Sequence, residues 1–215
     1  MEGWPDFRLA AANLTIGRGG QALASGLSFV LERGQALLVT GPNGAGKSTL
    51  LRTLAGLLSA IEGRISVTGT GLESGTPAGL CAHYLGHADG LKGALTVQEN
   101  LQFWAAMLGG RGPQPDIAGA LACVGLSHVA DFPAGYLSAG QKRRIALARL
   151  LVAERPLWLL DEPATALDAA SQDRLAAMMQ THRARGGVII AATHAPLGLE
   201  DARELRLSER AGALA

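Results

Sequence analysis

The residues GPNGAGKST, from Gly41 to Thr49, have the types and spacing needed to hold the phosphates of a nucleotide. Glycines allow successive backbone N–H groups to turn toward phosphate oxygens, and a helix that follows adds the partial positive charge of its N-terminus. The Lys47 ammonium can then reach the β- and γ-phosphates, and the Ser48 hydroxyl can ligate Mg²⁺. We predict an ATP site formed by Gly41, Pro42, Asn43, Gly44, Ala45, Gly46, Lys47, Ser48 and Thr49.

The segment LWLLDEP, from Leu157 to Pro163, carries a second set of reactive residues. Its four apolar residues predict a buried strand that ends at Asp161, where a carboxylate can hold Mg²⁺ directly or through water. Glu162 comes next and points differently, so it can polarise an attacking water as a general base. Carboxylate pairs also occur in solvated turns, but the apolar residues before this pair and the proline after it disfavour that alternative.

A strand, a loop and a helix must position the phosphate-binding residues, and the flanking sequence predicts them. Gly34 to Thr40 is an apolar run typical of a buried parallel strand, and leucine spacing from Lys47 to about Leu57 predicts a helix. Gly63 to Gly69 alternates like an edge strand, and GVIIAATH predicts a buried strand ending at His194. This alternation of strands and helices indicates an α/β fold with a parallel sheet.

Three more helices are predicted from their capping residues. Thr96 and Glu99 form a capping box for a helix that should end near Gly109–Gly110. Asp116 caps a second, short helix, and Asp168 caps a third. The residues predicted to face the core are Val97, Leu101, Trp104 and Leu108 in the first helix, Ile117, Leu121 and Val124 in the second, and Leu175, Met178, Met179 and His182 in the third.

The composition indicates a packed globular protein and disfavours several functional classes. Of the 215 residues 48% are hydrophobic and 17% are charged, and a formal net charge of +1 gives no electrostatic reason to expect nucleic acid as a partner. Cys81 and Cys123 fit no zinc or disulfide framework, and the CxxCH pattern of covalent haem attachment does not occur. There is no secretory signal and no run of about 18 apolar residues, so we predict that the chain does not itself span a membrane.

LSAGQ, from Leu137 to Gln141, opens an arginine-rich helix and distinguishes among classes of nucleotide-binding protein. With the segments above, it resembles the signature of ATP-binding-cassette (ABC) ATPases, usually written LSGGQ, with Ala139 replacing one glycine. The resemblance covers essentially the whole chain. It implies a P-loop NTPase fold of the ABC nucleotide-binding type, with an N-terminal antiparallel strand region, a mostly parallel core sheet and a helical subdomain. We expect one domain over residues 1–215, with its core at about 1–84 and 141–215 and the subdomain at about 85–140.

The resemblance also assigns roles outside the phosphate-binding loop. In this family the signature binds the γ-phosphate held by the other subunit of a dimer. Asp168, in the segment ALD, matches a loop that crosses the dimer interface, and His194 matches a switch histidine that contacts the γ-phosphate. A plain helix cap is the other interpretation of Ser138, and it is compatible with nucleotide binding. The implied nucleotide contacts are Leu137, Ser138, Ala139, Gly140 and Gln141.

His87 lies in YLGHADGLKGALTVQEN, where ABC ATPases normally have a loop with a glutamine. That glutamine touches Mg²⁺ and the attacking water and meets the membrane subunit, so the resemblance implies a catalytic and coupling role for His87. A plain loop residue and a haem ligand are the alternatives. Together with LSAGQKRRIALARL, this stretch resembles the ATPase subunit of the haem exporter in bacterial cytochrome c maturation (CcmA type).

The resemblance implies an enzyme, an ATP-hydrolysing subunit that powers haem export or the release of a haem-loaded chaperone in cytochrome c biogenesis. Its implied partners are a second copy of itself, sandwiching two ATP·Mg²⁺, and multi-spanning inner-membrane subunits. We expect a peripheral protein on the cytoplasmic face of the bacterial inner membrane, with no nucleic acid partner and no direct haem binding. The alternatives are the ATPase of another ABC exporter, for lipid or drug, and an ABC ATPase acting on DNA or ribosomes.

The adenine contact departs from the family pattern. An aromatic residue just after the first strand often stacks on the adenine, but NLTIGRGG offers Ile16 and Arg18 there. Arg18 can stack through its guanidinium plane, which makes it our candidate.

Overall fold

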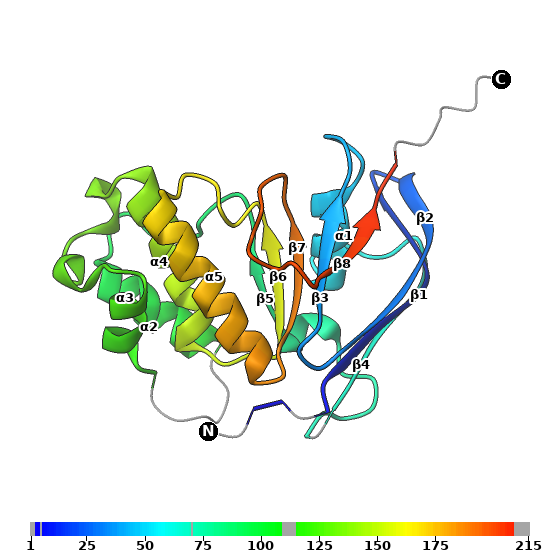
Figure 1. Cartoon of the computed structure of the whole chain (residues 1–215), viewed down its shortest axis with the longest axis horizontal. Helices are drawn as coiled ribbons and strands as arrows, with labels where there is room; N and C mark the ends of the chain where they lie inside the picture. Colours follow the sequence, from blue (N-terminus) through cyan, green and yellow to red (C-terminus); the bar gives the residue numbers. More distant parts are fainter. Residues whose placement is uncertain (1–2, 5, 70, 109–114, 209–215) are drawn as a thin grey trace.

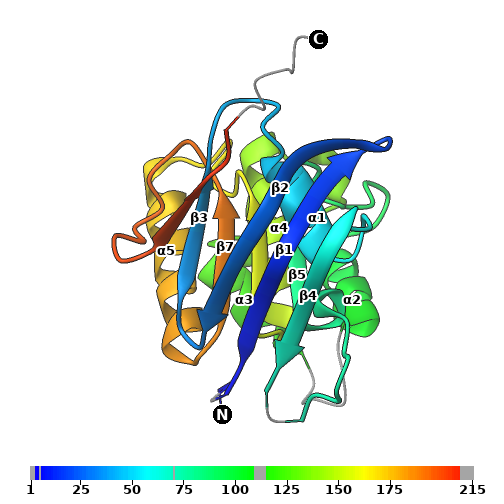
Figure 2. The same cartoon turned by 90° about the vertical axis from the view of Figure 1, so that its right-hand side faces the viewer.

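The protein consists of an antiparallel sheet, a parallel sheet and five α-helices in the part of the chain that the structure describes (Figures 1 and 2). This computed structural model describes residues 3, 4, 6–69, 71–108 and 115–208. The antiparallel sheet has the strand order β2-β1-β4 and the parallel sheet the order β5-β6-β7-β3-β8. The strands are β1 Arg8–Arg18, β2 Gln21–Glu32, β3 Ala36–Thr40, β4 Glu62–Thr68, β5 Ala82–Leu85, β6 Leu157–Asp161, β7 Val188–Ala192 and β8 Arg203–Arg206. The α-helices are α1 Lys47–Leu54, α2 Val97–Leu108, α3 Ile117–Cys123, α4 Ala139–Val152 and α5 Ala169–Ala184.

The parallel sheet is covered on both faces, which explains the unbroken apolar runs of β6 and β7. In β6, Leu157 and Leu159 pack with α1 and the antiparallel sheet, whereas Trp158 and Leu160 pack with helices α2 to α5. Figure 1 shows the same two groups on opposite sides of the sheet. The predicted α/β fold with a parallel core sheet and an N-terminal antiparallel region is confirmed, and β4 is an edge strand as predicted.

Side-chain caps start three helices where the sequence predicts them. Thr96 and Glu99 exchange side-chain-to-backbone hydrogen bonds of 2.8 and 3.1 Å before α2. Asp116 and Asp168 each accept a bond from the backbone N–H three residues ahead, of 2.8 and 2.9 Å, before α3 and α5. The predicted end of α2 at Gly109–Gly110 lies outside the described residues.

Two details of the predicted helices are wrong. Helix α1 ends at Leu54 and not near Leu57, because Gly56 turns the chain with a φ of 72° and leaves Leu57 61% exposed. In α2, Trp104 and Leu108 are only partly buried, and Ala105 belongs to the core with Val97 and Leu101. The leucine and aromatic spacing therefore predicted the two helices correctly, but not the end of one and the buried face of the other.

Helices α2 and α3 pack against α4, which itself lies on the parallel sheet. The predicted division into a core at about 1–84 and 141–215 and a subdomain at about 85–140 stays a prediction. Helix α4 packs on both parts and begins near their boundary, so it is the element that ties α2 and α3 to the sheet.

Two histidines are buried among the helices and strands. The Nε2 of His83 donates to the Ala153 carbonyl over 2.6 Å, so its Nδ1 is the unprotonated nitrogen and has no partner among the described residues. The ring of His182 stacks on Trp158 with 4.0 Å between centroids. Burial lowers the pKa of His83 from 6.5 to about 3 and that of His182 to about 4.

We predict that mild acid destabilises the fold through these two histidines. Below pH 6.5 the unfolded chain binds protons that the folded protein excludes until about pH 4 at His182 and about pH 3 at His83. The stability present above pH 6.5 should therefore fall with pH, by up to about 1.4 kcal/mol per pH unit for each histidine. Denaturant unfolding between pH 7 and about 5.5 measures this slope, at pH values where carboxylates stay largely ionised.

The variant His83→Gln keeps a donor for the Ala153 carbonyl and should remove one histidine's share of the slope. His128→Gln, which replaces an exposed histidine, is the matched control. A slope that is the same in wild type and His83→Gln would contradict this account.

Candidate active site

The phosphate-binding loop joins β3 to α1, and its shape depends on two glycines. Gly46 has a φ of 102° immediately before α1 begins. Gly41 has a φ of 135°, and a Cβ at this position would lie 2.2 Å from the Leu207 carbonyl oxygen. A larger residue at Gly41 would therefore displace the backbone that follows β8.

Lys47 holds its ammonium against this loop. Its Nζ donates to the carbonyl oxygens of Gly41, over 2.7 Å, and Pro42, over 3.0 Å, and the residue is only 9% exposed. The loop thus brings together a largely buried cation, turning backbone N–H groups and the N-terminus of α1. This is the combination of groups that binds the phosphates of a nucleotide.

Asp161, at the end of β6, contacts Ser48 on α1, although 113 residues separate them in the chain. Strand alternation turns the Asp161 side chain to the α1 face, where Ser48 Oγ donates to its Oδ1 over 3.0 Å. On the other oxygen, the Tyr84 hydroxyl donates over 3.4 Å while accepting from Arg52 Nε over 3.2 Å. Burial raises the pKa of Tyr84, so its hydroxyl keeps its proton for Asp161.

The oxygens of Ser48 and Asp161 fit Mg²⁺, a hard cation that prefers oxygen ligands. Among the described residues there is no cluster of three or more His, Cys, Asp or Glu side chains that could hold a metal. A site with one carboxylate and one hydroxyl instead suits an ion that takes its remaining ligands from substrate phosphates and water.

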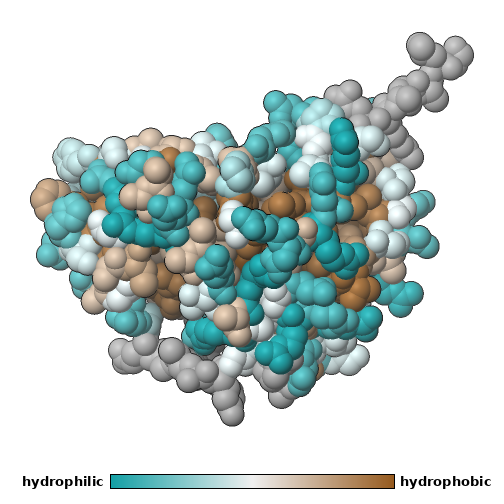
Figure 3. Space-filling view, viewed as in Figure 1, coloured by the Kyte–Doolittle hydropathy of each residue, from teal (hydrophilic) through white to brown (hydrophobic). Residues whose placement is uncertain are grey.

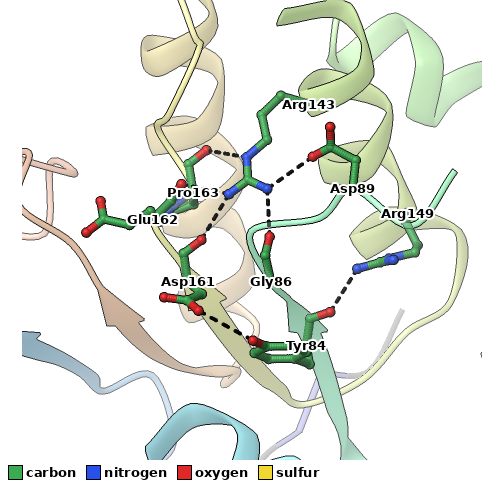
Figure 4. A network of polar contacts seen from close by, with 8 residues as sticks. All are labelled: Tyr84, Gly86, Asp89, Arg143, Arg149, Asp161, Glu162 and Pro163. Carbon is green, nitrogen blue, oxygen red and sulfur yellow. Dashed lines mark hydrogen bonds and ion pairs between the residues drawn. The ribbon is translucent and has the colours of Figure 1, made fainter. Parts of the chain in front are cut away.

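Glu162 and His194 come together from the ends of β6 and β7. The Glu162 Oε1 and His194 Nε2 lie 3.7 Å apart, and both side chains reach solvent, with 30% and 56% exposed. Glu162 has a φ of 48°, and its backbone N–H donates to the Ala192 carbonyl over 2.8 Å. This backbone turns the Glu162 carboxylate away from Asp161 (Figure 4) and leaves it accessible, as a general base must be.

The signature LSAGQ forms the start of α4. Ser138 accepts from the Gln141 N–H over 3.2 Å, and the Gln141 side chain accepts from the Ser138 N–H over 2.9 Å, so the capping box is complete. Ala139, in place of the family's glycine, is exposed. A Cβ on Gly140 would lie 2.9 Å from the Ala166 carbonyl oxygen, so only glycine allows this approach.

Within one chain the signature and the phosphate loop do not meet. Leu137 belongs to the core on the α2-to-α5 face of the parallel sheet, and Ala45 belongs to the core on the α1 face. Asp168 lies on the signature side, as the cap of α5, and its hydrogen bond from Ser171 lowers its pKa. The signature and the phosphate loop of one chain therefore lie on opposite faces of the sheet.

His87 is exposed and makes no hydrogen bond or ion pair among the described residues. Its neighbours are fixed, however, because Arg143 donates to the Gly86 carbonyl and to the Asp89 carboxylate over 2.9 and 3.2 Å. The sequence analysis missed Arg143 and also Tyr84. An arginine in an arginine-rich helix signals nothing by itself, since its burial depends on segments far away in the chain.

Of the two residues considered for contact with the adenine ring, Ile16 is too buried to make that contact. Ile16 is fully buried and lies below the phosphate loop, with its Cδ1 3.4 Å from where a Cβ on Gly46 would be. Arg18, at the end of β1, is exposed and stays our candidate for stacking.

The sequence comparisons agree with this geometry. The family model described as ABC transporter matches residues 24–165. Over 94% of the chain, the sequence is 54% identical to the cytochrome c biogenesis ATP-binding export protein CcmA of Chelativorans sp. (strain BNC1), and 55% identical to the protein of that name from Nitrobacter winogradskyi. These matches cover 98% of each relative. The chain belongs to the CcmA branch of the ABC transporter family.

The fold of this CcmA-branch chain matches solved structures too. A structure described as the ATP-binding subunit of an ABC transporter has a TM-score of 0.82 and 25% identity, over 94% of this chain and 88% of that one. The resemblance to ABC ATPases is thereby confirmed, and the chain is an ATPase that binds ATP.

We predict that Lys47 and Glu162 separate ATP binding from hydrolysis. Lys47→Ala should abolish binding, because the β- and γ-phosphates lose their ammonium partner. Glu162→Gln keeps the shape but not the base, so it should bind ATP normally and hydrolyse it about 10² to 10⁴ times more slowly. Nucleotide titration and steady-state phosphate release measure the two effects.

Two exposed residues provide matched controls for charge removal, Arg64→Ala for the lysine and Glu73→Gln for the glutamate. Near-normal affinity in Lys47→Ala would refute the phosphate-loop assignment. Wild-type turnover in Glu162→Gln would mean that another residue polarises the water.

Proposed function

We propose that the chain is the ATP-hydrolysing subunit of an ABC transporter complex that powers haem export, or the release of a haem-loaded chaperone, during cytochrome c biogenesis. The observation that carries this proposal is the 54–55% identity to cytochrome c biogenesis export proteins along nearly the whole of both chains. The geometry of Lys47, Asp161 and Glu162 supports its enzymatic part.

In this proposal each residue of the site has a separate role in hydrolysis. The loop N–H groups and Lys47 bind the triphosphate and neutralise its charge, and Glu162 takes a proton from the attacking water. His194 lies 3.7 Å from Glu162, where its ring can orient the carboxylate and contact the γ-phosphate. Mg²⁺, held by Ser48 and Asp161, supplies further charge neutralisation at the phosphates when bound.

A second copy of the chain completes the site in this proposal. The signature of one chain, at the N-terminus of α4, lies on the other face of its own sheet, so it is free to approach the phosphate loop of a partner. An exposed helix N-terminus adds favourable charge for a γ-phosphate. Closure on ATP and opening after hydrolysis would then move a membrane partner.

The partners we propose are multi-spanning inner-membrane subunits, with this chain peripheral on their cytoplasmic side. No helix in the described ranges is long and apolar enough to cross a membrane. The docking surface that we favour is the His87 loop with the adjoining residues 130–136, which carry Phe132 and Tyr136, 55% and 87% exposed. The backbone N–H groups of Gly135 and Ala134 donate to the carbonyl oxygens of Gly93 and Leu95, which follow the His87 loop, over 2.9 Å each. On the face shown in Figure 3, hydrophilic and hydrophobic side chains are interspersed.

We predict that the chain restores c-type cytochrome formation in a bacterium that lacks its own CcmA-branch subunit. Wild type should restore haem-stained cytochrome c and co-purify with inner-membrane proteins of the maturation system. Glu162→Gln should accumulate and co-purify but restore nothing, since ATP is not turned over. Co-purification with a lipid or drug permease, or with ribosomes, and no restoration, would contradict the proposed function.

We further propose that His87 orders the attacking water while its loop contacts the membrane subunit. Neutral imidazole, like an amide, can donate from one nitrogen and accept at the other. His87→Gln should therefore keep most of the ATPase activity, whereas His87→Ala should bind ATP normally and lose the stimulation given by membranes that contain the partners. Membrane-stimulated phosphate release measures both.

Two results would contradict this role of His87. Unchanged stimulation in His87→Ala would make it a plain loop residue. With stoichiometric haem, we expect no Soret band from the purified chain, and a band that His87→Ala abolishes would make this histidine a haem ligand.

A further inference from the structure

Arg143, one turn into α4, binds the backbone that carries the proposed general base (Figure 4). Its Nη2 donates to the carbonyl oxygens of Asp161, over 3.0 Å, and Glu162, over 2.6 Å, and its Nε donates to that of Pro163, over 3.2 Å. Glu162 has a φ of 48°, which is uncommon for a residue other than glycine. Such a conformation persists where its surroundings fix it, and here three consecutive carbonyls are fixed by one guanidinium.

The remaining nitrogen of the same guanidinium binds the His87 loop. Nη1 donates to the Gly86 carbonyl over 2.9 Å and to the Asp89 carboxylate over 3.2 Å. All five N–H donors of Arg143 are thus occupied, and its side chain is only 5% exposed. His87 itself lies between the two positions that Arg143 holds.

Other residues anchor the two ends of this loop. Arg149 Nη2 donates to the Tyr84 carbonyl over 2.8 Å, and Trp104 Nε1 donates to the Gly90 carbonyl over 3.1 Å. The Arg149 guanidinium also lies 4.4 Å from the centre of the Trp104 ring. The β5–β6 pairing and the Tyr84–Asp161 bond join the start of the loop to β6. Arg143 is the side chain that binds both residues 86–89 and the Glu162 carbonyl directly.

We infer that Arg143 is a positioning residue that transmits a displacement of the His87 loop to the backbone of Glu162. A membrane partner that shifts Asp89 moves the guanidinium, and the guanidinium carries the Glu162 carbonyl with it, which changes the aim of the carboxylate. The partner-driven part of this inference rests on the proposed function. The link itself, between residues 86–89 and 161–163, consists of hydrogen bonds within one chain and needs no partner.

Kinetics of Arg143→Lys test the positioning role. Lysine has three donors on one nitrogen and no fork, so it cannot fill five bonds. We expect ATP affinity within about threefold of wild type and a kcat lower by about tenfold to a hundredfold, as for a misplaced catalytic group. Arg144→Lys, on the same helix but bonded to the Val124 carbonyl, is the matched control. Equal loss of affinity and kcat, or a wild-type kcat, would overturn the inference.

Asp89→Ala tests transmission, because it removes one of the two bonds on the loop side of the link and none on the Glu162 side. With partner-containing membranes, it should lose most of the stimulation of ATP hydrolysis, and the double variant with Arg143→Lys should show no additional loss of stimulation. Losses of stimulation that multiply would mean that Asp89 and Arg143 act independently, which overturns transmission.

Hydrogen exchange on the purified chain gives an answer that needs no partner. Addition of ATP should change exchange in both residues 84–92 and residues 158–167 of wild type, and Arg143→Lys should weaken the first change much more than the second. An ATP response of residues 84–92 that is undiminished in Arg143→Lys would overturn the inference. Membranes that fail to stimulate wild type would instead count against the proposed function, and the exchange result would still stand.

Discussion

All strands of the parallel sheet run in one direction, and this constraint collects the reactive groups at one edge. The carboxyl ends of β3, β6 and β7 lie side by side, so the phosphate loop, the Asp161–Glu162 pair and His194 meet there although they are far apart in the chain. Strand β5 adds the His87 loop at the same edge. The alternation of β6 turns Asp161 to Ser48 on α1, and the positive φ of Glu162, just after the strand, turns its carboxylate away.

Some polar and charged side chains at this edge are buried and have hydrogen-bond partners, and others are exposed to solvent. Asp161 is buried and has hydroxyl donors on both oxygens, and Arg143 is buried with a partner for every donor. Glu162, His194 and His87 reach solvent instead. The buried bonds therefore fix the backbone, while the side chains that we propose to touch substrate or water keep their freedom. This division also explains how Glu162 can occupy a backbone conformation that few residues other than glycine adopt.

Helix α4 carries both the signature and the arginine that binds the Glu162 backbone. Its N-terminus carries the signature, which we propose to act on the nucleotide of a partner chain, and one turn later it carries Arg143, which holds the Glu162 backbone of its own chain. Helices α2 and α3 pack against the same helix. The His87 loop is bound by the Arg143 side chain of that helix. A rigid α4 would thus link three events: the approach of a second copy, the docking of a membrane partner and the positioning of the catalytic carboxylate.

The sequence alone determined the parts of this protein that depend on local spacing. The phosphate loop between a strand and a helix, the helix caps at Thr96, Asp116 and Asp168, and the apolar strand before Asp161 follow from residues close together in the chain. Only the tertiary structure decided the burial of Arg143, whose partner Gly86 is 57 residues away, and the separation of signature and phosphate loop onto opposite faces of the sheet. It also decided where α1 ends and that Ile16 is buried below the loop. Local patterns specify turns, caps and periodicity, whereas burial and hydrogen-bond partners depend on which distant segments the sheet brings together.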